Sequence, residues 1–199
     1  MAKTLYLLRH GETAANGRFI GSTDLPVAPH GFVQLDTTRD LLRKEGISRI
    51  FRSPMLRCRQ TSEYLGLWQT AEESAVLREI DFGDWEGKTF DEISREWPEK
   101  VQEWGTWSES FTFPAGESIG GFVARVRKAK SLIDSCDDEK ILVISHGGVI
   151  RTLICLYLGL SADKYLLFEI KAGCYATLSL FSEGGVLTSL NRGEVVMKI

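Results

Sequence analysis

Two segments of the chain are apolar at every position, which is the pattern of a strand buried on both faces. They are residues 5–8, near the start of the chain, and residues 141–144, in its last third. Helices cover both faces of a parallel sheet, so its central strands show continuous rather than alternating hydrophobic residues. A third strand is predicted at residues 49–51. These segments predict the centre of a mostly parallel sheet.

Hydrophobic residues recur at helical spacing after the predicted strands. The longest such stretch begins near Glu117, and its apolar face consists of Ile119, Phe122, Val123, Val126, Ala129, Leu132 and Ile133. Its other face is basic and carries Arg125, Arg127, Lys128 and Lys130. A helix with one apolar stripe packs that stripe against a core. We therefore expect the basic face to be solvated surface, in preference to an anion-binding site.

Three other helices and a hairpin complete the predicted elements. The helices cover residues 32–42, 55–68 and 149–158, and the hairpin pairs residues 175–181 with 186–190. Because strands and helices alternate, the sequence predicts an α/β fold in three layers, α/β/α, with right-handed crossovers. Functional groups of such folds gather at the carboxyl ends of the strands.

The interval 83–116 differs from the rest of the chain because it is rich in aromatic residues. It holds the aromatic residues Trp85, Phe90, Trp97, Trp104, Trp107, Phe111 and Phe113. Acidic residues and two prolines separate these side chains. We predict a small helical cap here, inserted between sheet elements of a single domain that spans residues 1–199. Its aromatic side chains are expected mainly to join the cap to the body, with contact to a substrate as the alternative for each.

Composition excludes several classes of protein. The 199 residues are 43% hydrophobic and 26% charged, which is ordinary globular usage. A net charge of −3 argues against a nucleic-acid partner, and no apolar stretch approaches the roughly 20 residues of a membrane span. The four cysteines form no Cys-x-x-Cys pair and there are three histidines, so a zinc site is not expected. Free thiols in a reducing cytoplasm are the expected state of the cysteines.

Two histidines follow the fully apolar segments in the same way. His10 follows Arg9, His146 follows Ser145, and each histidine precedes a glycine. Since the carboxyl ends of parallel strands meet at one edge of a sheet, we expect the two imidazoles to lie together. The third strand delivers Arg57, in the first turn of a helix, to the same edge. Arg9 and Arg57 would make this edge positive, and their planar guanidinium groups suit phosphate oxygens.

Five ordered motifs resemble those of the histidine phosphatase superfamily, the phosphoglycerate mutase-like group. They are Leu-Leu-Arg-His-Gly-Glu-Thr at residues 7–13, Ser-Pro-Met-Leu-Arg-Cys-Arg-Gln-Thr at 53–61, an acidic motif at 77–87, Pro-Ala-Gly-Glu-Ser at 114–118 and Ser-His-Gly-Gly at 145–148. The resemblance covers about residues 4–180. It implies a phosphomonoesterase that works through a phosphohistidine, without a metal or any other cofactor.

The resemblance also implies roles for individual residues. His10 resembles the nucleophile, which must be neutral, and a reference pKa near 6.5 supplies that form at pH 7. Glu79 resembles the general acid that protonates the leaving group and then activates water. The donors implied around the phosphoryl group are Arg9, Arg57, His146, Asn16 and the backbone N–H of Gly147.

For several residues the sequence allows more than one role. The carboxylates that compete with Glu79 for the acid role are Glu12, Asp81 and Glu86. Glu117 and Ser118 are expected either to cap a helix or to contact the substrate. The positions that depart from the usual motifs of the family are Ile20, Cys58 and Ala115.

The cap region most resembles the alpha-ribazole phosphatases of cobalamin biosynthesis, which implies alpha-ribazole 5'-phosphate or another small phosphomonoester as the substrate. A phosphoglycerate mutase is the alternative, but cofactor-dependent mutases are typically longer than this chain between Gly87 and Glu117. An inactive module that binds phosphorylated ligands is less favoured, because the chain keeps the residues that such catalysis needs, namely Arg9, His10, Arg57, Glu79 and His146. The sequence predicts no oligomeric state.

Overall fold

A computed structural model describes residues 3–194, and the ends of the predicted single domain lie outside these residues. Within the described range the sheet has six strands in the order β3-β2-β4-β1-β5-β6. They are β1 (Lys3–Arg9), β2 (Arg49–Arg52), β3 (Ala71–Glu73), β4 (Lys140–Ser145), β5 (Tyr175–Phe181) and β6 (Gly184–Arg192). β1 to β4 are parallel, whereas the β5–β6 hairpin joins β1 in antiparallel pairing. The predicted mostly parallel sheet is confirmed.

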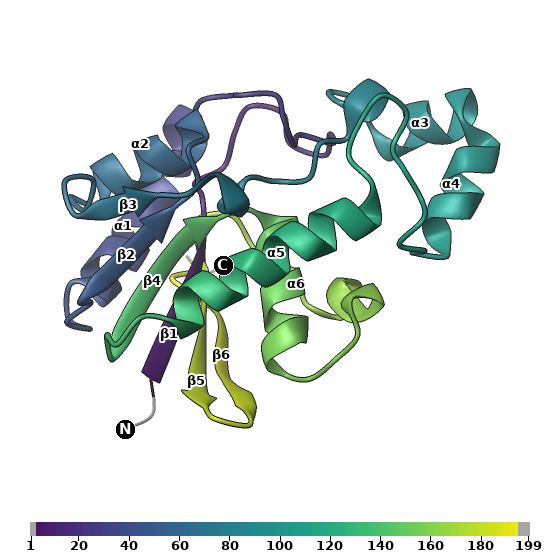
Figure 1. Ribbon diagram of the computed structural model, residues 1–199. Helices are drawn as coiled ribbons and strands as arrows, with labels where there is room; N and C mark the ends of the chain where they lie inside the picture. The colour runs from purple at the N-terminus through teal and green to yellow at the C-terminus, as the bar shows by residue number, and fades with distance from the viewer. Residues whose placement is uncertain (1–2, 195–199) are drawn as a thin grey trace.

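Helices cover both faces of this sheet (Figure 1). They are α1 (Pro29–Leu42), α2 (Leu56–Tyr64), α5 (Ile119–Asp134) and α6 (Gly147–Tyr157), with α3 (Phe90–Glu96) and α4 (Pro98–Gly105) set apart. Leu5 and Leu7 of β1 pack in the core beneath α5 and α6. Tyr6 and Leu8 pack in the core beneath α1 and α2. Successive strand residues point to opposite faces, so both faces of β1 are apolar and the three-layer α/β/α fold is confirmed.

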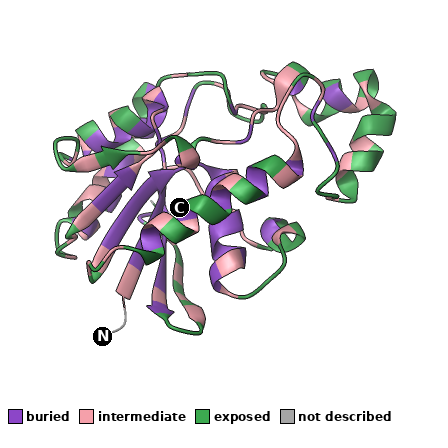
Figure 2. Ribbon diagram, in the orientation of Figure 1, coloured by how far each residue is buried: buried purple, intermediate pink, exposed green. Residues whose placement is uncertain are grey.

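The segment 83–116 projects from one end of the sheet and carries α3 and α4 (Figure 1). Most of the surface of its two helices is exposed, in contrast to the buried strands (Figure 2). Aromatic side chains attach this segment to the rest of the protein. Trp85, Phe111 and Phe113 are fully or almost fully buried. The Trp85 ring lies 6.0 Å from that of Phe19, in the loop after β1. These three aromatic side chains therefore join the segment to the body.

Among the described residues, no helix has both the length and the apolar character that crossing a bilayer requires.

Candidate active site

The two predicted histidines meet at the carboxyl edge of the sheet. β1 and β4 are parallel neighbours, and their register pairs Arg9 with Ser145. The next residues, His10 and His146, therefore leave the sheet side by side, and their ring centroids are 5.1 Å apart. The His10 backbone N–H donates to the carbonyl of Ser145 at 3.0 Å. The expected meeting of the imidazoles across neighbouring strands is observed.

The ring of His10 is held in one tautomer. Its Nδ1 lies 2.8 Å from the carbonyl oxygen of Gly11. A carbonyl only accepts hydrogen bonds, so Nδ1 carries the proton and Nε2 keeps its lone pair. Gly11 is fixed in turn, because its N–H donates to Thr61 Oγ1 at 3.0 Å. A side chain at position 11 would place its Cβ 2.9 Å from Val27, so glycine is needed there.

His146 is also neutral, with the opposite arrangement of its ring. Arg57 Nε donates to His146 Nδ1 at 3.1 Å, which places the proton on Nε2, 2.8 Å from Ser53 Oγ. The other Arg57 nitrogens donate at 2.9 Å to the carbonyls of Gly21 and Thr23. Both ring nitrogens of His146 are thus occupied by protein groups, and its direct contact with a phosphoryl group stays a prediction. The role of Ser53 was missed, although it stands directly after β2, where functional groups gather.

Burial and positive charge act together on the two imidazoles. Burial lowers the pKa of His10 well below its usual value, and the nearby guanidinium groups of Arg57 and Arg9 lower it further. Burial likewise lowers the pKa of His146, and Arg57 adds to this. A buried histidine favours its neutral form because the charged form loses hydration. Both rings are therefore neutral near pH 7.

The same shifts predict how stability depends on pH. The unfolded chain protonates its histidines near pH 6.5, whereas folded His10 and His146 do not, so the unfolded state binds more protons below that pH. Their stabilisation is thus fully present above pH 6.5 and is lost as the pH falls, by up to about 2.7 kcal/mol per pH unit. Urea unfolding at pH 7.5, 6.5 and 5.5 measures this slope. A His10→Gln variant should show about half the histidine contribution. Equal slopes for His10→Gln and the unsubstituted protein would contradict the prediction.

A cavity of about 100 Å³ opens in front of His10. Its lining includes Arg9, His10, Asn16, Ile20, Arg57 and Glu79. Arg9 donates to the carbonyl of Ile170 at 2.7 Å, and its buried Nε has no hydrogen-bond partner among the described residues. The structure therefore brings Asn16 and four of the five predicted catalytic residues around one small cavity, with His146 fully buried beside Arg57.

Glu79 joins this cavity from the loop after β3. Its Oε2 accepts the backbone N–H of Gly148 at 2.9 Å, and its Oε1 accepts that of Ile80 at 3.1 Å. The carboxyl group is thus held at the N-terminus of α6 by a backbone N–H of that helix. A Cβ at position 148 would lie 2.5 Å from Glu79 Oε1, so glycine leaves room for the carboxyl group.

Two of the three competing carboxylates, Glu86 and Asp81, lie outside the small cavity. Glu86 accepts backbone N–H bonds of 2.8–3.2 Å from Gly21, Ser22, Thr23 and Phe82, which fixes the loop that also bonds to Arg57. Asp81 accepts the N–H of Gly83 at 3.0 Å in a local turn. Glu12 lines the small cavity, but its Oε2 accepts a 2.8 Å bond from Gln34.

Glu117 and Ser118 of the Gly-Glu-Ser motif both contact residues of α5. The Ser118 side chain accepts the N–H of Gly121 and caps α5, so the interpretation as a helix cap is confirmed. The Glu117 carboxylate forms an ion pair with Arg125 of α5 at 2.7 Å. Neither side chain lines the cavity that contains His10. Contact of these two residues with a substrate stays a prediction.

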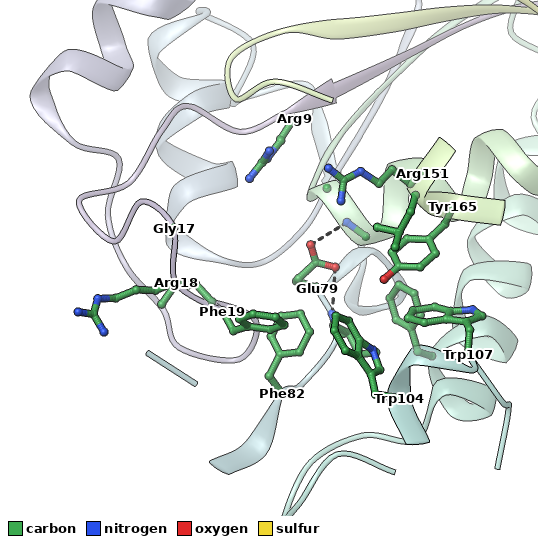
Figure 3. A pocket seen from close by; sticks show the side chains of 16 residues that line it. Arg9, Gly17, Arg18, Phe19, Glu79, Phe82, Trp104, Trp107, Arg151 and Tyr165 are labelled. Atoms are coloured by element: carbon green, nitrogen blue, oxygen red, sulfur yellow. Dashed lines mark hydrogen bonds between the residues drawn. The ribbon is translucent and has the colours of Figure 1, made fainter. Parts of the chain in front are cut away.

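A second cavity of about 340 Å³ adjoins the first and shares Arg9, Ile20 and Glu79 with it. Its aromatic lining consists of Phe19, Phe82, Trp104, Trp107, Phe122 and Tyr165. In Figure 3, Arg9 and Arg151 lie on one side of Glu79, and Phe82 and Trp104 lie on the other. The rings of Trp107 and Tyr165 stack with centroids 4.0 Å apart. Two of the cap aromatics, Trp104 and Trp107, are thus placed to meet a bound molecule.

Sequence reasoning also missed Arg151. It stands one helical turn after Gly147 on α6 and lines this larger cavity with it. Its buried Nε has no hydrogen-bond partner among the described residues. Helical spacing from Gly147 was the signal that could have found it, because residues four apart share one face of a helix.

Two neutral histidines, a pair of arginines and a carboxylate at one edge of a mostly parallel sheet define a class of phosphoryl-transfer site. The family model of the histidine phosphatase superfamily (branch 1) matches residues 5–193, and the chain belongs to this family. The protein is accordingly a phosphatase.

Particular relatives extend over nearly the whole chain. The adenosylcobalamin/alpha-ribazole phosphatase of Salmonella typhimurium is 30% identical and is aligned over 96% of this chain and 97% of its own length. Phosphoserine phosphatase 1 of Hydrogenobacter thermophilus is 27% identical over 94% of this chain and 91% of its own. Among solved structures, the alpha-ribazole phosphatase from Shigella flexneri has a TM-score of 0.85 at 25% identity, covering 98% of this chain and all of that one.

Proposed function

We propose that this phosphatase is metal-independent and transfers the phosphoryl group of a monoester to Nε2 of His10. The observation that carries the proposal is the fixed, neutral tautomer of His10, whose free nitrogen belongs to a ring that lines the small cavity. Nε2 attacks phosphorus with its lone pair as the bond from phosphorus to the leaving oxygen breaks. Water then attacks the phosphohistidine, the P–N bond breaks, and Nε2 regains its lone pair.

Positive charge without a metal supports this chemistry. The negative charge of a transferring phosphoryl group is spread over its three equatorial oxygens. Arg9 and Arg57 line the cavity, and Gly147 is the first residue of α6, where its backbone N–H has no partner within the helix and can bind an anion. These donors take the part that bound metal ions play in other phosphatases.

Glu79 is the acid and base of both steps in this proposal. As a carboxylic acid it gives its proton to the leaving oxygen, and as a carboxylate it then removes a proton from the attacking water. Its position on the cavity supports the role, since Glu86 and Asp81 bond to backbone N–H groups outside that cavity. Glu12 also lines the cavity, but its Oε2 accepts a hydrogen bond from Gln34.

For the substrate we propose alpha-ribazole 5'-phosphate, a small metabolite with a planar aromatic base. The aromatic lining of the larger cavity, including Trp104 and Trp107, supports it, because flat rings stack favourably on such side chains. Phosphoserine is the second candidate. It is favoured by Arg151, whose guanidinium in the same cavity would suit a carboxylate.

A panel of phosphomonoesters tests this proposal, with alpha-ribazole phosphate, phosphoserine and 3-phosphoglycerate as its members. We expect the highest kcat/KM for alpha-ribazole phosphate. The Trp107→Ala variant should lower that value about tenfold, chiefly through KM, because a stacking contact is worth up to about 1.5 kcal/mol. It should leave phosphoserine turnover nearly unchanged.

Trp68→Ala is the matched control, since Trp68 is an exposed tryptophan that lines neither cavity. A preference for phosphoserine would replace the first candidate by the second. Equal losses on both substrates in Trp107→Ala would contradict a stacking contact, and formation of 2-phosphoglycerate would indicate a mutase.

The state of the cysteines supports a cytoplasmic location within this proposal. Cys58, Cys136, Cys155 and Cys174 are free thiols in the described range, and thiols persist in reducing compartments.

A further inference from the structure

Arg125 does not belong to the solvated surface on which the sequence analysis placed it. Its side chain is only 20% exposed, and its guanidinium lies against the loop that carries Glu79. Nη1 donates to the carbonyls of Arg78 and Val76 at 2.5 and 3.2 Å, and Nη2 donates to the carbonyl of Glu79 at 3.2 Å. Three backbone carbonyls on one side of the loop are thus bound by a single side chain.

Glu117 fixes the guanidinium that makes these bonds. Arg125 Nε donates to Glu117 Oε1 at 3.1 Å, and Arg125 Nη2 donates to Glu117 Oε2 at 2.7 Å, which is a bidentate pair. The backbone N–H of Glu117 also donates to the carbonyl of Asp81 at 2.9 Å. The loop is therefore anchored to the start of α5 on both sides of Glu79.

Neither anchor touches the reacting groups. Arg125 and Glu117 line neither the cavity of His10 nor the aromatic cavity. They face a different hollow, of about 470 Å³, on whose lining Glu79 also lies. What they control is the backbone from which the Glu79 side chain reaches the N–H of Gly148.

We infer that Arg125 and Glu117 are positioning residues that hold the general acid Glu79 at the leaving-group side of the cavity. This inference rests on the proposed role of Glu79. Displacement of a catalytic group by about 1 Å costs on the order of 10²-fold in rate. Loss of the anchors should therefore impair proton donation while leaving attack by His10 intact.

Substrates with different leaving groups distinguish proton donation by Glu79 from attack by His10. An alkyl alkoxide needs the proton of Glu79, whereas p-nitrophenolate departs without it. In single-turnover experiments, Arg125→Ala should slow phosphoenzyme formation from an alkyl phosphate by about 10- to 100-fold. Formation from p-nitrophenyl phosphate should change less than about threefold, and KM should stay nearly constant. Glu117→Gln, which keeps the shape of the side chain but weakens the pair, should give the same pattern with a smaller loss.

Two controls make the test decisive. Arg127→Ala removes the same charge from an exposed position of the same helix and should change neither rate. The double variant Glu79→Gln with Arg125→Ala should be no slower on the alkyl phosphate than Glu79→Gln alone, because both changes remove one function. Additive losses, or equal losses on the two substrates, would overturn the inference. If Arg125→Ala does not fold, as circular dichroism would reveal, Glu117→Gln decides by the same criteria.

Failure of the proposed function would look different. In that case the unsubstituted protein would form no phosphohistidine from p-nitrophenyl phosphate, or Glu79→Gln would not distinguish the two substrates. With both of these reference measurements in place, a normal Arg125→Ala rate on the alkyl phosphate would count against the positioning role alone.

Discussion

Replacement of His10 by alanine is expected to abolish turnover while the protein remains folded. The proposed nucleophile is lost, and in this mechanism neither water nor another side chain takes the place of Nε2 in forming the covalent intermediate. The fold should survive because His10 lies at the end of β1, outside both clusters of the hydrophobic core. Brief reaction of the unsubstituted protein with labelled substrate should trap a phosphoenzyme that is labile in acid and stable in base.

His30→Ala is the control for this experiment, since His30 is exposed and does not itself line the small cavity. It should retain full activity and full labelling. The thermal unfolding midpoint of each variant separates loss of chemistry from loss of fold. An acid-stable label on serine, threonine or aspartate, or activity that persists in His10→Ala, would contradict the phosphohistidine mechanism.

Replacement of Glu79 by glutamine should have the second largest effect, and the effect should depend on the leaving group. The amide keeps the size of the carboxyl group but has no acidic proton to donate. General acid catalysis contributes about 10²- to 10⁴-fold, so phosphoenzyme formation from an alkyl phosphate should slow by that factor. p-Nitrophenyl phosphate should react nearly as before in this step. Slow hydrolysis of the phosphohistidine should then limit its turnover and produce a burst of p-nitrophenol.

Asp81→Asn provides the matched change from carboxylate to amide. Asp81 is two residues further along the same loop and lies outside the cavity of His10, so its substitution should produce no dependence on the leaving group. If Asp81→Asn gave the pattern expected of Glu79→Gln, or if Glu79→Gln slowed both substrates equally, the acid would have to be assigned to another residue.

The centre of the fold could be predicted because its signals are local. Residues 5–8 and 141–144 are apolar at every position, and both are central strands of the sheet. The meeting of His10 and His146 followed from parallel pairing at a common edge and needed no side-chain geometry. The motif resemblance also singled out Arg9, Arg57 and Glu79, which line one cavity. Their roles stay predictions.

Other features depend on contacts between distant segments and left no local signal. β3 is only three residues long, with two exposed glutamates, and it is a strand because β2 offers it an edge. The helix predicted over residues 55–68 ends at Tyr64, just before Gly66 adopts a positive φ of 74°. The sequence predicted a solvated position for Arg125, because hydrophobic periodicity separates the apolar face of a helix from its polar face. Periodicity does not show which polar side chain will contact another segment, here the loop that carries Glu79.

The place of β1 in the sheet has a consequence for how the chain folds during synthesis. β1 lies between β4 and β5, and these partners begin only at Lys140 and Tyr175. At about 5–20 residues per second, a ribosome needs on the order of ten seconds between making β1 and making either partner. For that time the nascent chain carries an unpaired, wholly apolar segment, which is a natural target for chaperones. A fragment that stops before β4 would possess His10 but could not build the pocket around it.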